Sequence, residues 1–308
     1  MSLRIVSLIA SATEIVCELG FEKQIVGRSH ECDFPHSVLD LVPCTKPKFD
    51  TTVSSREIDH QVKDVLKNSL AVYSVNDEII KSLKPTHIIT QAQCEVCAVS
   101  LKDVELMVQD WTGTDTKVIS LQPDSLEHIW ADISLVSKSL GAKEEGSALI
   151  SRLKNRMEKI KSQSSSLNKR PKIACIEWID PLMSAGNWIP ELVEMAGGNN
   201  LLGEAGKHSP WMSLENLVQS DPDKIIIMPC GFDIPRIKKE MTPLTTSVEF
   251  MKLRAVKNNE VYITDGNQYF NRPGPRVVES LEIFAEIFHP SNFNFDFEGS
   301  GWQKYSFN

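Results

Sequence analysis

Short apolar runs rich in Val and Ile alternate with longer helical stretches along this chain, and the alternation occurs twice. Runs of this length are typical of buried strands rather than helices. Because helical stretches separate the runs, the pattern predicts mostly parallel sheets with helices on both faces. The expected strands cover residues 4–9, 24–28, 87–91 and 117–121 in the first half, and residues 172–178, 224–228 and 260–264 in the second.

A long helical tract separates the two halves of the pattern. One helix is expected over residues 125–140, where Gly141 ends it, and a second is expected over residues 142–166. In the second helix apolar residues such as Leu153 and Met157 recur every three or four positions, and charged residues fill the opposite face. This spacing is typical of an amphipathic helix, and its place in the chain predicts a rigid connector.

We therefore expect an α/β fold of two similar Rossmann-like lobes with parallel-rich central sheets, joined by one long α-helix. Residues 1–141 form the expected N-terminal lobe, 142–168 the connecting helix, and 169–308 the C-terminal lobe with an irregular tail. The division is supported by residues 85–90 and 222–227, which both place a proline before a buried strand. Ligands bind beyond the carboxyl ends of strands in open parallel sheets, so a ligand cleft is expected between the lobes.

The composition of the 308 residues excludes several classes of protein. With 41% hydrophobic residues, the chain can bury a substantial core and is not disordered throughout. A formal net charge of -8 argues against a nucleic-acid partner, because binding to phosphates requires a basic surface. No apolar run approaches the roughly 20 residues that span a bilayer, so no membrane insertion is expected.

The start of the chain and the cysteine count bear on the compartment. Arg4 and the apolar residues 5–12 resemble a minimal signal peptide, yet the single positive charge and the short run fit a buried first strand better. Seven cysteines form an odd, sparse set that does not suggest a disulfide framework. We therefore expect a cytoplasmic protein, with a periplasmic or extracellular location as the alternative if a native leader has been removed.

Two short motifs combine histidine and cysteine at the ends of expected strands. His30-x-Cys32 follows the second strand, and Cys94-x-x-Cys97 follows the third. One imidazole and three thiolates are a known ligand set for zinc, and such ligands also suit an iron–sulfur centre. Two other interpretations stay open: a redox dithiol at a helix N-terminus, or small buried hydrophobic residues beside a histidine that makes an ordinary polar contact.

Aromatic residues gather in the loops of the second half. A large ring at a strand end either fills the core or grips a flat ligand. Trp178 stands at a strand end and is expected to lie half in the core, while Trp188 fits either role. The aromatic residues considered are Trp178, Trp188, Trp211, Phe232, Tyr269 and Phe270.

Three polar residues are also candidates for ligand contacts. Asn271 and Arg272 stand just before an expected helix over residues 275–288, where they could grip an anion or an amide. A proline-stiffened turn with a solvated arginine is the alternative. His30 could ligate the metal of a bound molecule, because neutral imidazole is the commonest metal ligand, or it could cap a turn.

The sequence contains no familiar catalytic motif. It has no Gly-x-Ser-x-Gly elbow, no phosphate-binding P-loop and no His-Glu-x-x-His pair. A non-enzymatic protein is therefore favoured over an enzyme.

Several segments together resemble a known family. Residues 4–14, followed by Leu19, Gly20 and residues 25–27, are similar to the opening of the vitamin B12- and iron-siderophore-binding proteins of ABC importers, the type III substrate-binding proteins. The similarity covers roughly residues 4–289. It is also carried by segments 187–192, 196–199 and 221–226, and the loops 30–35, 94–97 and 271–276 look like a subgroup usually labelled cobalamin-binding.

The resemblance implies two lobes joined by a single helix, with a ligand clamped between them. It implies a binding protein for a corrinoid (vitamin B12-like) or another metal chelate, with cobalamin as the expected ligand and an ABC transporter permease as the expected partner. By similarity, the residues that line the cleft are His30, Trp178, Trp188, Phe232 and Tyr269.

Two alternatives use the same scaffold. One is a cytoplasmic metal- or iron–sulfur-binding protein or enzyme, in which His30, Cys32, Cys94 and Cys97 hold zinc or an iron–sulfur centre. The other is a cytoplasmic adaptor whose cleft no longer takes a ligand.

Overall fold

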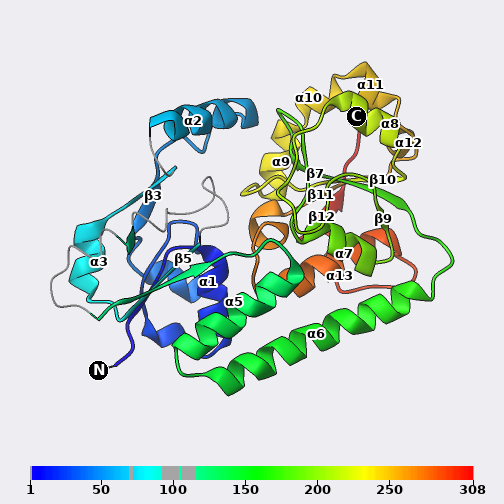
Figure 1. Cartoon of the computed structure of the whole chain (residues 1–308). Helices are drawn as coiled ribbons and strands as arrows, with labels where there is room; N and C mark the ends of the chain where they lie inside the picture. Colours follow the sequence, from blue (N-terminus) through cyan, green and yellow to red (C-terminus); the bar gives the residue numbers. More distant parts are fainter. Residues whose placement is uncertain (1, 69–71, 92–103, 106–114, 308) are drawn as a thin grey trace. The chain divides into compact units, whose positions relative to one another are not determined.

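The computed structural model describes two compact units, each built around its own sheet (Figure 1). The predicted α/β fold with parallel-rich sheets is confirmed. Unit 1 comes from residues 1–151 and unit 2 from residues 152–308, except that residues 54–56 and 124–126 belong to unit 2. The predicted lobe boundaries and the ligand cleft stay predictions. The described residues are 2–68, 72–91, 104–105 and 115–307.

Unit 1 contains a four-stranded sheet in the order β2-β1-β5-β6, in which all neighbours run parallel. Every strand expected in the first half is present, and the central strands are fully buried. The first strand is shorter than expected because a helix begins soon after it. The strands are β1 (Ile5–Ser7), β2 (Ile25–Arg28), β5 (His87–Gln91) and β6 (Lys117–Leu121).

The helices of unit 1 begin and end at residues suited to those positions. Asn76 caps α3, because its side chain accepts a hydrogen bond from the backbone N–H of Ile79 at 3.0 Å. Gly141 adopts a φ of +76° just after α5, the left-handed conformation that commonly ends helices. These helices are α1 (Ala10–Glu18), α3 (Asp77–Leu83) and α5 (Leu126–Ser139).

A small antiparallel pair that the sequence did not predict lies beside the end of β2. It consists of β3 (Thr45–Pro47) and β4 (Tyr73–Val75). The backbone N–H of Cys44 donates to the carbonyl of Arg28 at 2.7 Å, which fastens the start of β3 next to the residues that follow β2. Three helical segments lie in this part of the chain: η1 (Glu22–Gln24) before β2, η2 (His36–Asp40) between β2 and β3, and α2 (Ser55–Asn68) between β3 and β4.

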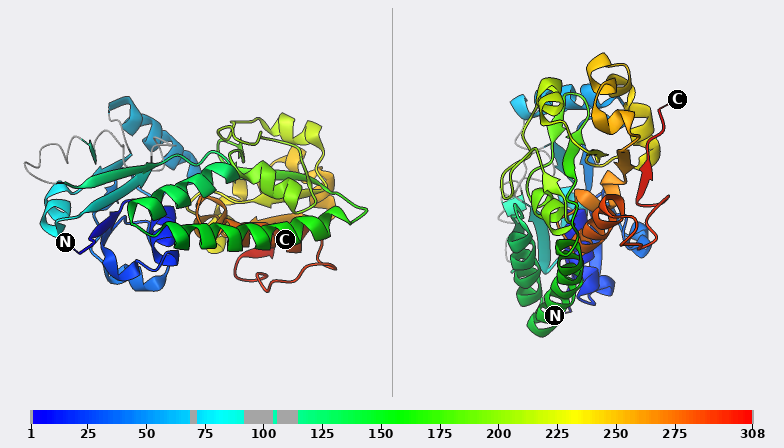
Figure 2. Two further views of the ribbon diagram at one scale, coloured as in Figure 1. Left: turned by 60° about the horizontal axis from the view of Figure 1, so that its bottom comes forward. Right: turned by 90° about the vertical axis from the view of Figure 1, so that its right-hand side faces the viewer.

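The long amphipathic helix is α6 (Lys143–Ser165), and the division between the units falls inside it. Leu153 and Met157, on its predicted apolar face, are both 2% exposed. In unit 2, α6 runs alongside α13 (Val277–Phe288), as Figure 2 shows. The Arg156 guanidinium of α6 donates to both carboxylate oxygens of Glu282 on α13, at 2.8 and 2.9 Å.

Unit 2 contains a sheet in the order β12-β11-β10-β7-β8, and β9 also pairs with β7. The three expected strands form its parallel centre. The antiparallel strands β8 and β12 were not predicted, and β12 lies in the tail that we expected to be irregular. The strands are β7 (Lys172–Trp178), β8 (Met183–Ser184), β9 (Asn199–Asn200), β10 (Lys224–Ile227), β11 (Val261–Thr264) and β12 (Trp302–Lys304).

The tail is held by one buried carboxylate on α13. Glu286 is 4% exposed, and its Oε2 accepts a hydrogen bond from the indole N–H of Trp302 at 2.7 Å. Its Oε1 accepts hydrogen bonds from the backbone N–H groups of Phe295 and Phe297. The chain after α13 is therefore packed against unit 2, and this allows β12 to pair with β11.

The remaining helices of unit 2 are mostly short. The closing helix α13 begins two residues later than expected and is almost entirely buried. In the described part of the chain, no helix combines the length and the apolar character that a bilayer crossing requires. The short helices are α7 (Ile189–Met195), α8 (Leu214–Ser220), α9 (Ile234–Glu240), α10 (Thr242–Thr245), α11 (Val248–Met251), α12 (Arg254–Lys257) and η3 (Gly266–Phe270).

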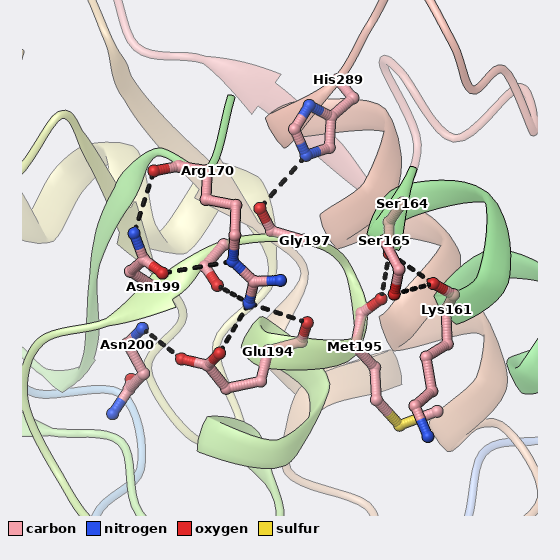
Figure 3. Close-up of polar contacts among 11 residues, drawn as sticks. Lys161, Ser164, Ser165, Arg170, Glu194, Met195, Gly197, Asn199, Asn200 and His289 are labelled. Carbon is pink, nitrogen blue, oxygen red and sulfur yellow. Dashed lines mark hydrogen bonds and ion pairs between the residues drawn. The ribbon is translucent and has the colours of Figure 1, made fainter. Parts of the chain in front are cut away.

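A polar network fastens the end of α6 to the turn that follows α7 (Figure 3). The hydroxyl of Ser164 donates to the carbonyl of Met195 at 2.7 Å. His289, just after α13, places Nε2 3.3 Å from the carbonyl oxygen of Gly197. The turn therefore joins the ends of three helices.

Arg170 completes this network. Its Nη2 donates to the Glu194 carboxylate at 2.6 Å and to the carbonyl of Gly198 at 2.7 Å, and its Nε donates to Asn199 Oδ1 at 3.2 Å. The segment 196–199, which carried part of the family resemblance, thus has a structural role in unit 2.

Candidate functional site

Two aromatic rings meet at the carboxyl end of the unit 2 sheet, where ligands bind in open parallel sheets. Trp178 is the last residue of β7, and its ring centroid lies 5.2 Å from that of Phe232, which follows β10. The guanidinium of Arg236 stands over the Phe232 ring at 4.7 Å. The indole N–H of Trp178 donates to the carbonyl of Asp180 at 3.2 Å, which fixes the orientation of the ring.

The register of three adjacent strand segments extends this pair of rings into a row. Trp178 pairs with Met183 of β8, and Met183 forms an antiparallel bridge with Trp211. The β7–β8 pairing shifts register between Ile176 and Trp178, so these pairings make the four residues neighbours along this edge of the sheet. We call Phe232, Trp178, Met183 and Trp211 the Trp178 platform.

The Trp178 platform becomes more exposed toward the edge of the sheet. Phe232 is 6% exposed, Trp178 and Met183 are half-buried, and Trp211 is 55% exposed. Sequence reasoning did not include Met183 or Trp211 among the predicted site residues. One sequence feature could have identified Trp211. It lies in a polar, Gly-containing loop, where an indole has no obvious core to fill and is therefore a candidate for ligand contact.

The other predicted ligand contacts of unit 2 hold its loops in place. Trp188 is 5% exposed, and its indole N–H donates to the carbonyl of Phe270 at 3.2 Å. The Asn271 amide donates to the carbonyls of Met228 and Gly266 at 3.1 and 2.9 Å. These contacts are those of core and loop-fastening residues, and ligand contacts by Trp188 and Asn271 stay predictions.

Tyr269 and Arg272 belong to the loop after β11. Tyr269 is half-buried, with the guanidinium of Arg276 4.6 Å from its ring centroid. Arg272 is only 5% exposed and donates to Asn267 Oδ1 at 3.2 Å. Asp265 starts the loop by accepting hydrogen bonds from two backbone N–H groups, and burial raises its pKa. Ligand contacts by Tyr269 and Arg272 stay predictions.

His30 follows β2 at the carboxyl end of the unit 1 sheet. Its Nδ1 lies 2.7 Å from the hydroxyl of Thr45, and the edge of its ring meets Tyr73 with centroids 4.8 Å apart. Burial, with the nearby charge of Arg28 as a smaller cause, lowers the pKa of His30 to about 4. The imidazole is therefore neutral near pH 7, which is the form that binds metals.

The predicted cluster of His30 and three cysteines receives no support. Cys32 is completely buried, and its sulfur lies 3.0 Å from the hydroxyl of Thr13, as expected for a small core residue. Cys94 and Cys97 lie outside the described residues. Among the residues that are described, no group of three or more His, Cys, Asp or Glu side chains could hold a metal ion.

The sequence and fold place the chain in a known family. Residues 5–268 match the periplasmic binding protein family. The chain therefore belongs to this family, and the resemblance to the substrate-binding proteins of ABC importers is confirmed. The cobalamin-binding subgroup stays a prediction.

Individual relatives agree with this assignment. The chain is 25% identical over 228 residues to the high-affinity heme uptake system protein IsdE of Staphylococcus aureus, covering 73% of each chain. A periplasmic heme-binding protein from Pseudomonas aeruginosa has a TM-score of 0.74 at 17% identity, covering 100% of this chain and 99% of that one. The periplasmic vitamin B12-binding protein BtuF of Vibrio cholerae has a TM-score of 0.65 at 21% identity, covering 94% and 97%. The structural likenesses show the fold.

The prediction of a cytoplasmic protein is wrong. The chain belongs to the periplasmic binding protein family, and the two solved relatives above are described as periplasmic. The described cysteines are free, as the sequence indicated, but Cys32, Cys44 and Cys175 are buried. A buried thiol behaves as a small hydrophobic residue, so it carries little information about the compartment.

Proposed function

We propose that this chain is the ligand-binding component of an ABC importer for a planar metal tetrapyrrole, a corrinoid or heme. Family membership supports the class of protein. The relatives support the ligand class, because IsdE is a heme uptake protein and BtuF binds vitamin B12. The observation that carries the proposal is the Trp178 platform at the carboxyl end of the unit 2 sheet.

The Trp178 platform has the chemistry of a stacking surface for a flat macrocycle. Aromatic rings bind flat apolar ligands through large contact areas, and the methionine thioether adds a polarizable contact. Because Trp211 is 55% exposed, a ligand that covers it would remove a large apolar surface from water. The four platform residues are uncharged, but the Arg236 guanidinium lies over the Phe232 ring, so the macrocycle would stack on Trp178, Met183 and Trp211.

His30 supplies a separate recognition element in unit 1. A neutral imidazole can ligate iron or cobalt at an axial position, and metal-bound histidines usually hold the other ring nitrogen in a hydrogen bond. His30 Nδ1 has such a partner in Thr45 at 2.7 Å, which leaves Nε2 as the nitrogen for the metal. We assign this role to His30. Substitutions of unit 1 residues in the whole protein test it.

The two sources of this ligand chemistry are distinguished by titration. Purified protein is titrated with cyanocobalamin, aquocobinamide and hemin, and binding is followed by visible spectra and by tryptophan fluorescence. The loops that resemble the cobalamin-binding subgroup favour a corrinoid, whereas the name of IsdE favours heme. We expect saturable binding with a Kd on the order of micromolar or tighter for at least one probe. Binding weaker than about millimolar for all three probes would refute the proposal.

A matched pair of variants tests the platform. Trp178→Ala should weaken binding about tenfold or more, because aromatic anchors carry a large share of binding energy. Val248→Ala is the control, since Val248 is 59% exposed in unit 2 but does not belong to the platform. Equal affinities for the two variants would show that the macrocycle does not stack on Trp178.

A further inference from the structure

We infer that Ser29 and Thr45 form a hydroxyl chain that selects the tautomer of His30, which makes Thr45 a positioning residue for axial metal ligation. The inference rests on the proposed function, because it concerns the same histidine. It adds a selectivity element that neither the family resemblance nor the relatives assign.

The chain of contacts converges on one hydroxyl. Thr45 Oγ1 lies 3.0 Å from Ser29 Oγ, 3.0 Å from the backbone nitrogen of His30 and 2.7 Å from His30 Nδ1. Ser29 and Thr45 are 1% and 7% exposed, so water competes little for these contacts. Ser29 and His30 follow β2, and Thr45 is the first residue of β3.

The number of hydrogens limits the possible arrangements. A threonine hydroxyl has one hydrogen and two lone pairs. The backbone N–H of His30 can only donate, and it therefore occupies one lone pair of Thr45. The hydrogen and the second lone pair of Thr45 are left for Ser29 and for His30 Nδ1, and the two partners must take opposite roles.

Two arrangements satisfy this condition, and they give different tautomers. In the first, Thr45 donates to Ser29 and accepts from Nδ1–H, so Nε2 of His30 keeps its lone pair. In the second, Ser29 donates to Thr45 and Thr45 donates to Nδ1, so Nε2 carries the hydrogen. Only the first arrangement leaves Nε2 able to bind a metal, since ligation requires that lone pair.

Two neighbours keep the imidazole in the orientation that this choice requires. The ring of Tyr73 meets the His30 ring edge-on, at an interplanar angle of 81°. Tyr73 is itself anchored, because its hydroxyl donates to Glu31 Oε1 at 2.6 Å. The backbone N–H of Glu31 also donates to Ser29 Oγ at 3.4 Å, so this hydroxyl can accept from Thr45 and Glu31 together.

The consequence is selectivity for a metal with an axial position open to imidazole. In the first arrangement the hydroxyl chain already accepts the Nδ1 hydrogen in the free protein, so such a ligand finds the Nε2 lone pair available. A macrocycle without a metal, or with both axial positions blocked, gains nothing from the chain. Removing the hydrogen-bond partner of a metal-binding histidine typically changes metal affinity by about 10- to 100-fold.

The tautomer is measured first in the free protein. Nitrogen NMR of 15N-histidine-labelled wild type, Thr45→Ser and Ser29→Ala distinguishes the protonated ring nitrogen of His30. In Ser29→Ala the Thr45 hydroxyl loses its acceptor and should donate to Nδ1, which shifts His30 toward the Nε2–H form. Thr45→Ser should resemble the wild type. An unchanged tautomer in Ser29→Ala would overturn the hydroxyl chain, whether or not any tetrapyrrole binds.

Ligation is measured second, with hemin and aquocobinamide as metal probes and metal-free protoporphyrin as the control. Thr45→Val, which keeps the shape and removes the hydroxyl, should weaken the metal probes about tenfold or more and weaken their imidazole-ligation bands. Thr45→Ser should keep both, and protoporphyrin should bind all variants alike. If Thr45→Val fails to fold, Ser29→Ala supplies the same comparison with a several-fold loss.

The outcomes separate the two proposals. If no probe binds the wild type, the proposed function fails, while the NMR comparison still decides the tautomer chain. If His30→Ala loses the ligation bands but Thr45→Val and Ser29→Ala do not, His30 ligates without help, and the role given to Thr45 is wrong.

Discussion

The turn after α7 allows a sharp test of how unit 2 is held together. Gly197 adopts a φ of +82°, a conformation that costs a residue with a side chain roughly 1–2 kcal/mol. A Cβ at this position would lie 2.9 Å from Nε2 of His289 and 3.0 Å from Cβ of Ser164. Gly197→Ala therefore combines backbone strain with a steric conflict in the network of Figure 3.

A second glycine provides the matched control. Gly206 has a similar φ of +74°, but a Cβ there would meet nothing within 4 Å. Gly206→Ala should lose only the backbone contribution, roughly 1–2 kcal/mol. Gly197→Ala must also displace the contact between His289 and the Gly197 carbonyl, and a hydrogen bond of this kind contributes about 1 kcal/mol. With the strain at Ser164 added, Gly197→Ala should be less stable than Gly206→Ala by about 1–2 kcal/mol.

The free energy of unfolding is measured by urea denaturation and followed by tryptophan fluorescence. Trp178, Trp188, Trp211 and Trp302 all belong to unit 2, so the signal reports mainly on that unit. The midpoint should fall further for Gly197→Ala than for Gly206→Ala, at a similar denaturant slope. Equal midpoints for the two variants would refute the close packing of the turn against α6 and α13.

Three further predictions test separate features. Trp211→Ala should weaken tetrapyrrole binding by several-fold yet change the urea midpoint little, because the side chain is 55% exposed; a large loss of stability with unchanged affinity would contradict its place in the Trp178 platform. Glu286→Gln should destabilise the protein by about 1–3 kcal/mol, because it leaves buried N–H groups poorly paired. Limited proteolysis should then cut the tail near Trp302. A tail as resistant to proteolysis as in the wild type would count against its anchoring by Glu286. The pKa of His30 should be found near 4 by NMR titration, below its ordinary value of 6.5. Between these two pH values the unfolded state binds more protons, so the contribution of His30 to stability is complete above about pH 6.5 and is lost as the pH falls toward 4. A titration midpoint near 6.5 would contradict the burial argument.

The parallel centres of both sheets could be predicted because the sequence encodes them locally. β10 (Lys224–Ile227) is a short run of Ile bounded by a proline on each side, and it needs no partner to be recognised as a buried strand. The antiparallel edges could not be predicted in this way. β8 (Met183–Ser184) has two residues, too few for any periodicity, and β12 forms because Glu286 holds Trp302 against the core. Such strands depend on tertiary contacts rather than on local pattern.

The candidate site shows the same division. Trp178 and Phe232 could be found because Trp178 ends one recognisable strand and Phe232 follows another, and topology brings strand ends to one edge of a sheet. Trp211 reaches the platform through its bridge to Met183, and cross-strand register is not visible in the sequence. Thr45 was missed because its approach to His30 also depends on a tertiary contact. The backbone hydrogen bond from Cys44 to Arg28 holds the start of β3 beside the end of β2, and this brings Thr45 next to His30.

The two proposed recognition elements differ in what they can distinguish. The Trp178 platform recognises a flat apolar surface, and stacking of this kind is nearly the same for macrocycles with or without a metal. His30 responds to the metal alone, because an imidazole lone pair has no favourable partner in a metal-free ring. Burial lowers the pKa of His30, so protons do not compete for the lone pair near neutral pH. In the proposed hydroxyl chain, Ser29 and Thr45 keep that lone pair on Nε2. Affinity and metal selectivity are therefore assigned to different residues, and a substitution in one element should leave the contribution of the other intact.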